Sequence, residues 1–271
     1  MPGLFGHELL TIAFCWRLER RDGIALGFTT HDRDLRRGGL TYRASPGMLP
    51  SEISISDGLE ADSLDVGGAL TGDSISAADL AAGRWDGAAV QVFMVDWEMP
   101  EGEAFPVARG ELGEVSIKGD AFEAELRGPV ALLEAAVAEQ TSPACRAQLG
   151  DKRCRVDLAG RTRVTRVVAS PEADRIEVED AGSGNEFGGG RLRWLGGENS
   201  GLENQVLLSD GPLLILDEPP AFPAVAGDLV EITEGCDRIL ATCSGRFANA
   251  ANFRGEPHLP GIDLLTRYPG A

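Results

Sequence analysis

Two separated pairs of cysteines constrain this chain more than any other feature of its sequence. Cys145 and Cys154 form the first pair, Cys236 and Cys243 the second, and together they are four of the five cysteines in 271 residues. Thiolates that hold a single zinc ion usually lie about two to four residues apart. The longer loops inside these pairs suit a bulkier group, such as a cubane iron–sulfur cluster on four thiolates. Zinc, disulfides and inert buried thiols are the alternatives.

Positive charge gathers around both pairs, although the whole chain has a net charge of −18. The basic residues are Arg146, Lys152, Arg153 and Arg155 near the first pair, and Arg238, Arg246 and Arg254 near the second. Cations close to a thiol lower its pKa and offset the negative charge of a thiolate-bound cluster. We therefore expect a basic shell that neutralises the thiolates.

Length and composition favour a globular protein of two or three domains. No run of 18 apolar residues occurs, so we expect no membrane insertion. The first residues lack the pattern of a signal peptide, which predicts folding in a reducing cytoplasm and argues against disulfides. The excess of 43 acidic over 25 basic residues argues against a protein that grips nucleic acid. If acidic residues line a channel, DNA would slide along it without binding, but composition alone favours the alternative that the acidity keeps the surface soluble.

The first 140 residues have the pattern of short strands separated by glycine turns. We predict strands at 10–18, 24–28, 40–42, 51–55, 63–66, 88–97, 107–112, 114–118 and 121–127. Two helices are expected, at 76–83 and 129–139, each with a suitable residue at its start. Many strands with few helices predict a β-barrel or sandwich with a helix packed on one face.

A second β-rich module follows the first cysteine pair. Its six predicted strands are 163–167, 175–178, 191–194, 205–208, 213–216 and 229–232, which is typical of a small barrel. The predicted protein is thus mainly β, α+β with few helices. It has an N-terminal domain at 1–140, a barrel module at 156–233, and a cysteine-bearing region made of 141–155 and 234–271. Because the cysteine pairs flank the barrel, its folding should bring them together.

Three other signals favour structural roles. The glycine-rich stretch 182–190 precedes a strand and lacks the Lys-Ser or Lys-Thr of a phosphate loop, which favours a flexible hairpin. His31, within the stretch 29–34, is a candidate metal ligand or base, but a structural role is favoured, and His7 and His258 have no nearby carboxylate and nucleophile in a recognisable arrangement. Cys15 lies beside Trp16 in an apolar strand, where a packed thiol is expected. No catalytic constellation is found, and we predict a protein that is not an enzyme.

Three stretches of the sequence, 27–35, 235–243 and 247–261, resemble a family of phage tail proteins. The family occurs in alphaproteobacterial prophages and gene transfer agents and is similar to the baseplate hub of siphophage-like tails. The resemblance implies a trimeric ring around the DNA exit channel, in the baseplate of a particle assembled in the host cytoplasm. Its implied partners are the distal tail protein, the host-specificity or fibre protein and the cell-wall peptidase, with DNA passing through but not specifically bound.

The cysteine spacing is also similar to that of the phage lambda tail-tip protein, which carries a 4Fe-4S cluster. This resemblance implies that Cys145, Cys154, Cys236 and Cys243 are the four ligands. The stretch 155–235 between the pairs is much longer than in the lambda protein. We therefore expect a structural hub in which the cluster acts as a staple. A zinc-stapled protein and an iron–sulfur redox enzyme are the alternatives, and a cell-wall hydrolase is disfavoured because no cysteine has the histidine context of a nucleophile.

Overall fold

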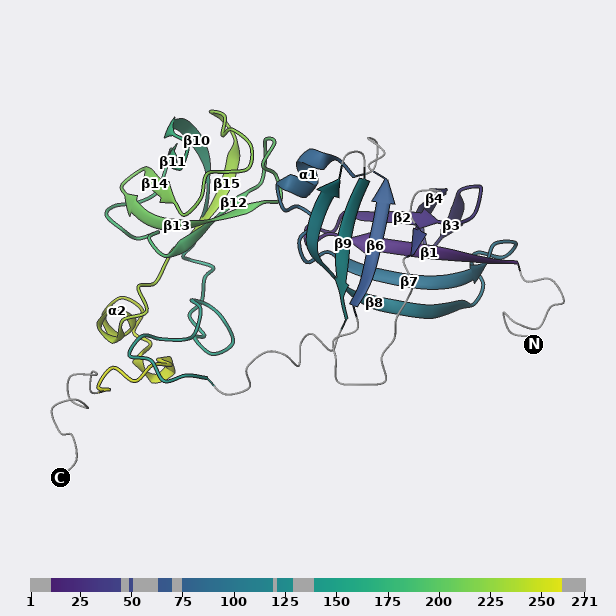
Figure 1. The fold of residues 1–271 in the computed structure, drawn as a ribbon. Helices are drawn as coiled ribbons and strands as arrows, with labels where there is room; N and C mark the ends of the chain where they lie inside the picture. Colours follow the sequence, from purple (N-terminus) through teal and green to yellow (C-terminus); the bar gives the residue numbers. More distant parts are fainter. Residues whose placement is uncertain are drawn as a thin grey trace, which may run out of the picture. The chain divides into compact units, whose positions relative to one another are not determined.

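The computed structural model describes residues 11–44, 49–50, 63–69, 75–118, 121–128 and 139–259. The chain divides into two compact units, Met1–Val137 and Ala138–Ala271, and each is described by itself (Figure 1). Both units are built mainly of strands with few short helices, which confirms the predicted fold class. No helix among the described residues is long and apolar enough to cross a membrane.

One nine-stranded sheet forms the N-terminal unit. In spatial order its strands are β3 (Leu35–Arg37), β4 (Leu40–Ala44), β2 (Ala25–Thr29), β1 (Ile12–Glu19), β7 (Ala89–Asp96), β8 (Ala104–Lys118), β9 (Ala121–Arg127), β6 (Ser63–Ala69) and β5 (Leu49–Pro50). The pairing is antiparallel except between β2 and β4. The long strand β8 curves, so that β9 and β6 run across the direction of β7 (Figure 1).

Alternate side chains of β1 enter two different cores, because successive residues of a strand point to opposite faces. Trp16 and Leu18 belong to the larger core, whereas Ala13 and Cys15 belong to the smaller one. The short helix α1 (Ala77–Ala81) adds Leu80 to the larger core. Ser76 caps this helix as predicted, since its Oγ accepts a hydrogen bond from the Asp79 amide at 3.0 Å.

One prediction in this unit was wrong. The segments 107–112 and 114–118 are not two strands, because both belong to the continuous strand β8. The register with β9 shifts between Leu112 and Val115, so the intervening glycine lies at a β-bulge rather than a turn. The predicted strand 51–55 and all but the last residue of the predicted helix 129–139 lie outside the described residues.

The C-terminal unit contains a closed six-stranded barrel, and all six predicted strands are confirmed. Around the barrel the order is β10 (Thr162–Glu172), β11 (Arg175–Val178), β14 (Leu213–Leu216), β13 (Glu203–Asp210), β12 (Gly190–Trp194) and β15 (Leu229–Thr233). Ile176, Leu192, Leu214, Val230 and Ile232 have no exposed surface and fill its interior together with Phe187. Closure leaves no unpaired edge in this small module.

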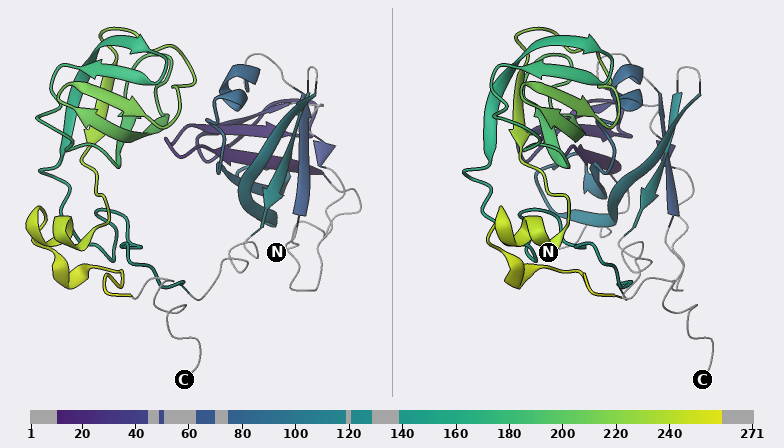
Figure 2. Two further views of the ribbon diagram at one scale, coloured as in Figure 1. Left: turned by 60° about the vertical axis from the view of Figure 1, so that its left-hand side comes forward. Right: turned by 90° about the vertical axis from the view of Figure 1, so that its left-hand side faces the viewer.

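Two short helical elements follow the barrel, α2 (Leu240–Gly245) and the 3₁₀ turn η2 (Ala250–Asn252). In Figures 1 and 2 they lie beyond one end of the barrel, beside the chain that leads into β10. The cysteine-bearing segments are therefore gathered at one end of a rigid β module.

Candidate metal centre

Strand pairing in the barrel explains why the two cysteine pairs meet. β10 and β15 are antiparallel neighbours, and Thr162 at the start of β10 pairs with Thr233 at the end of β15. The chain that enters β10 and the chain that leaves β15 therefore emerge at the same end of the barrel. The first carries Cys145 and Cys154, and the second carries Cys236 and Cys243. The predicted approach of the two pairs is thus built into the topology.

Backbone hydrogen bonds join the two segments directly. The Cys145 amide donates to the Arg238 carbonyl at 2.9 Å, and the Arg146 amide donates to the Arg254 carbonyl at 3.0 Å. Farther along, the Glu256 amide donates to the Ser142 carbonyl at 2.8 Å. These bonds align residues 142–146 with Arg238 and with residues 254–256 of the C-terminal segment. Cys145 is consequently held against the C-terminal segment by main-chain contacts.

Three of the four sulfurs accept hydrogen bonds from N–H groups. The Arg238 amide donates to Cys236 Sγ at 3.4 Å, and the Arg254 amide donates to Cys145 Sγ at 3.3 Å. The Asn249 side-chain Nδ2 donates to Cys154 Sγ at 3.6 Å. Donors directed at cysteine sulfurs are among the groups that tune iron–sulfur clusters. The fourth sulfur, Cys243 Sγ, instead donates as a thiol to the Asn249 carbonyl at 3.4 Å, a bond that a thiolate does not make.

Unusual backbone conformations concentrate in these segments. Arg155, Arg238 and Ala248 have φ of 63°, 62° and 49°, and they are the non-glycine residues with positive φ in the described part of the chain. Arg155 directly follows Cys154, and Arg238 lies two residues after Cys236. A left-handed conformation costs a non-glycine residue about 1–3 kcal/mol and is retained where the surroundings impose it. Such conformations cluster at functional sites, which fits a site formed by these loops.

The prediction that nearby cations depress the thiol pKa values is wrong for two cysteines. Burial raises the pKa of Cys236, and the proximity of Asp237, Cys145 and Cys154 raises it further. Burial likewise raises the pKa of Cys243, with added repulsion from the other three cysteines. The thiols of the site are therefore close enough to oppose the ionisation of Cys236 and Cys243. A positively charged group near these two thiols would offset this cost.

Several arginines of the expected shell bind carboxylates instead of facing sulfur. Arg146 pairs with both Glu139 and Glu256, and Arg153 also pairs with Glu139. The shared arginines lower the pKa of Glu139, and the hydrogen bonds from Arg146 and the Ser142 amide lower that of Glu256 to about 2. These side chains therefore brace the segments around the cysteines. The contacts to sulfur from Arg238 and Arg254 come from their backbone amides, not from their charges.

A latch of charged and aromatic side chains fastens α2 to the barrel. Glu234 Oε2, which follows β15, accepts hydrogen bonds from Arg161 Nη1 and Arg246 Nη2, each at 2.7 Å. Both guanidinium groups also lie over the Phe247 ring, 4.8 and 5.0 Å from its centre. Arg246 Nη2 further donates to the Glu186 carbonyl at 2.8 Å. The helix that carries Cys243 is thereby tied to the barrel end.

The glycine-rich stretch has a different role from the one predicted. It connects β11 to β12, which are not paired with each other, so it is a crossover and not a hairpin. A Cβ on Gly235 would meet the Gly188 carbonyl oxygen at 2.0 Å, and one on Gly189 would meet the Cys236 carbonyl at 3.1 Å. Glycine at these positions allows the crossover to pack closely against the chain that leads to Cys236.

The placed side chains bear on three alternatives for the four cysteines: disulfides, a single zinc ion and a cluster. None of the five cysteines forms a disulfide. Within the described ranges, no group of three or more His, Cys, Asp or Glu residues is placed to hold a metal ion. Thiolates on one zinc ion would lie within about 4 Å of one another, because each Zn–S bond is about 2.3 Å. The donor chemistry, four thiols with N–H groups aimed at three of them, suits a thiolate-bound metal group.

Cys15 and His31 belong to the N-terminal unit. Cys15 is 1% exposed, its Sγ contacts Thr29 Oγ1 at 3.6 Å, and burial raises its pKa, as expected for a packed thiol. His31 Nδ1 accepts a hydrogen bond from the Arg33 amide at 3.1 Å, and its ring lies 5.1 Å from that of Trp97. These contacts order the turn after β2. They give His31 the structural role that the sequence favoured.

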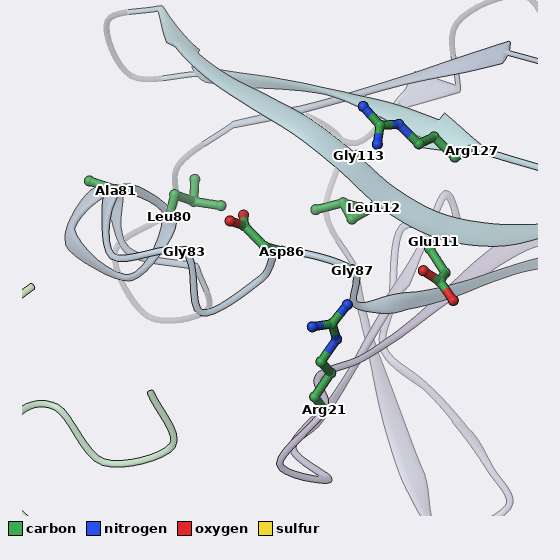
Figure 3. A pocket seen from close by; sticks show the side chains of 10 residues that line it. All are labelled: Arg21, Leu80, Ala81, Gly83, Asp86, Gly87, Glu111, Leu112, Gly113 and Arg127. Carbon is green, nitrogen blue, oxygen red and sulfur yellow. The ribbon is translucent and has the colours of Figure 1, made fainter. Parts of the chain in front are cut away.

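Each unit contains a cavity. One, of about 520 Å³ in the N-terminal unit, is lined by Arg21, Asp86, Glu111 and Arg127 among others (Figure 3). Its charged side chains are of both signs and come from separate segments, so they do not form one charged site. A second cavity of about 400 Å³ lies between the barrel and the cysteine segments and reaches Cys236. This cavity places one edge of the cysteine site beside open space.

Comparisons with known proteins cover both units. Residues 2–157 match the family of baseplate hub protein, N-terminal attachment domain, and residues 185–263 match a family described as phage conserved hypothetical protein BR0599. The chain is also similar to a chain in a solved structure of the virion of a native gene transfer agent (GTA) particle. The two are 39% identical, with a TM-score of 0.87, and the match covers 98% of this chain and 94% of that chain. No curated protein matches the chain.

Proposed function

The chain belongs to the phage baseplate hub family and is a structural protein of a virion tail, and we propose that its four paired cysteines hold a structural 4Fe-4S cluster. In this proposal the protein forms a ring around the DNA exit channel of the baseplate. Its activity is mechanical assembly, and it catalyses no reaction. The cluster would be held by Cys145, Cys154, Cys236 and Cys243, and its Fe–S bonds would supply covalent cross-links between the two segments.

The main support for the cluster is that both cysteine pairs lie at one end of the barrel. They do so because β10 pairs with β15. The neighbouring cysteines raise the cost of ionising Cys236 and Cys243, and N–H groups point at three of the four sulfurs. A thiolate-bound iron core would supply positive charge that offsets this cost. It also explains why residues in strained conformations are maintained around the cysteines.

The proposed role of the cluster is that of a staple. The short segments that flank the barrel in the sequence contain few buried hydrophobic residues, among them Ala147, Cys154 and Cys243. Segments with so small a core need cross-links to hold a fixed conformation. Metal ligation supplies folding free energy in such cases. We therefore infer that the cluster fixes the cysteine segments on the barrel so that they present one defined surface.

Ring formation is supported by the family and by the charge of the chain. Hub proteins surround the path of DNA, and a net charge of −18 would keep DNA from adhering to the ring. In the described part of the N-terminal unit, Met99 and Trp97 are 64% and 36% exposed, which suits surfaces covered by neighbouring proteins. We propose a trimer whose partners are the distal tail protein, the host-specificity or fibre protein and the cell-wall peptidase.

Particle assembly tests the hub role independently of the cluster. Producer cells that lack the chain should make particles whose tails have no tips, and the wild-type chain supplied in trans should restore them. A chain with all four site cysteines replaced by serine should restore tips poorly, whereas Cys15→Ser should restore them fully. Complete, DNA-delivering particles without the chain would refute the hub role. Full rescue by the chain without the four cysteines would refute only the structural cluster.

A further inference from the structure

Asn249 contacts one cysteine from each pair. Its Nδ2 donates to the Cys154 carbonyl at 2.6 Å and to Cys154 Sγ at 3.6 Å. Its backbone amide donates to the Cys243 carbonyl at 2.9 Å, and its own carbonyl accepts from Cys243 Sγ at 3.4 Å. Cys154 and Asn249 are 95 residues apart in the sequence. A single non-cysteine residue therefore joins the first pair to the second, through its side chain at Cys154 and its backbone at Cys243.

The orientation of the Asn249 amide is fixed by a second asparagine. Asn252 Nδ2 donates to Asn249 Oδ1 at 2.7 Å. Because Oδ1 is occupied as an acceptor, the two N–H groups of Asn249 must face the other way, toward Cys154. The turn before it also matters, since Ala248 has φ of 49° and directs Asn249 back toward α2. Both the backbone and the side chain of Asn249 are consequently aimed at the cysteine site.

The two backbone polar groups of Cys154 both bind side chains rather than main chain. Its amide donates to Asp151 Oδ1 at 2.6 Å, and its carbonyl accepts from Asn249 Nδ2 at 2.6 Å. The following residue, Arg155, has a left-handed conformation. Cys154 therefore lies in no regular element that would fix its position. Without the Asn249 side chain, the Cys154 carbonyl would lose this hydrogen bond.

We propose that Asn249 is a positioning residue for the cluster, an inference that rests on the proposed function. Its side chain holds the Cys154 carbonyl and donates an N–H to the Cys154 sulfur, while its backbone holds Cys243. Asparagine suits this position because it is neutral and provides both a donor and an acceptor. An aspartate of the same shape would place a carboxylate beside thiolates and remove the donor. Partners that orient metal ligands in this way commonly affect metal affinity strongly.

The test compares Asn249→Asp with Asn204→Asp in the full chain, purified without oxygen. Asn204 is a matched control in the barrel, because it accepts a hydrogen bond from Trp194 and donates to the Glu218 carbonyl but contacts no cysteine. Iron release to an added chelator is followed by absorbance, and the reduction potential is measured on the same samples. We expect Asn249→Asp to release iron about tenfold faster than wild type and to have a more negative potential. Asn204→Asp should match wild type in both measurements.

A second variant covers the case in which Asn249→Asp does not fold. Asn252→Ala keeps the Asn249 side chain and removes only the group that orients it, so it should change iron release in the same direction by a smaller factor. If Asn249→Asp folds and releases iron at the wild-type rate with the wild-type potential, the positioning role is overturned. If it does not fold, wild-type values in Asn252→Ala overturn that role instead. Neither result contradicts the cluster itself. A wild-type protein that contains no iron would overturn the proposed cluster, and the positioning role with it.

Discussion

Arg146 and Glu256 form an ion pair with two hydrogen bonds, which joins the segment of the first cysteine pair to the C-terminal segment. Arg146 Nη1 and Nη2 lie 2.6 and 2.9 Å from the two carboxylate oxygens of Glu256, and the residues are 110 positions apart. The same carboxylate accepts the Ser142 amide at 2.9 Å. Arg146 directly follows Cys145. A residue expected to neutralise a thiolate therefore clamps the C-terminal segment onto the first cysteine pair.

This pair predicts a specific dependence of stability on pH. Its hydrogen bonds lower the pKa of Glu256 from 4.5 to about 2, so the folded state favours the ionised carboxylate. A depressed carboxyl pKa stabilises the fold above the unfolded-state pKa and loses this contribution as pH falls toward the folded value. In the iron-free chain, Glu256→Gln should therefore be less stable than wild type at pH 6. The difference should shrink between pH 5 and pH 2, as measured by urea unfolding; a constant difference would contradict this origin.

Single replacements of the site cysteines should act alike. Serine at Cys145, Cys154, Cys236 or Cys243 should abolish or deeply weaken iron binding, because a cluster needs all four ligands. Cys15→Ser should leave it intact, since Cys15 lies in the N-terminal sheet. The measurements are iron content and absorbance at roughly 400 nm, where iron–sulfur charge transfer occurs. Equal iron loss from Cys15→Ser would contradict the ligand assignment.

The latch on α2 should contribute measurably to the stability of the C-terminal unit. Glu234 is 12% exposed and binds two arginines, so Glu234→Gln should lower the free energy of unfolding by about 2 kcal/mol. Glu203→Gln is the matched control, because Glu203 is 43% exposed and its Arg191 partner lies 3.3 Å away. Such exposed pairs contribute under about 1 kcal/mol. Equal losses in chemical denaturation would show that Glu234 does not fasten the helix.

The barrel interior should dominate the stability of the module that supports the cysteines. Ile232 has no exposed surface, and Ile232→Ala should cost about 2–5 kcal/mol through lost burial and an unfilled cavity. Val164 lies on the neighbouring strand β10 but is 60% exposed, so Val164→Ala should change stability by less than about 0.5 kcal/mol. Denaturant unfolding compares the two. A small effect at Ile232 would mean that the barrel is not the supporting core.

The barrel was predictable because its strands alternate and its turns carry glycine. In β12, for example, Leu192 and Trp194 face the interior, and Gly211 provides the positive φ between β13 and β14. The same signals misled at residue 113, since a glycine within a bulged strand resembles one in a turn. The distinction depends on the partner strand, which local sequence does not reveal.

The meeting of the cysteine pairs was predictable, but the surroundings of the sulfurs were not. The charge count near Cys145 suggested neutralisation, whereas Arg146 binds carboxylates 7 and 110 residues away. Asn249 also gave no local signal, because its contact with Cys154 depends on the closed barrel. Its place within a stretch that resembles the tail protein family was the one indication of a role. Contacts between distant segments follow from topology rather than from residue type.

Metal analysis of the wild-type chain tests the central claim most directly. Protein purified without oxygen should contain about four iron and four acid-labile sulfide atoms per chain, with little zinc, if the four cysteines hold a 4Fe-4S cluster. The same protein should be brown. About one zinc per chain without sulfide would instead identify a zinc-stapled hub. A folded chain that assembles into tails with neither metal would contradict the stapled centre altogether.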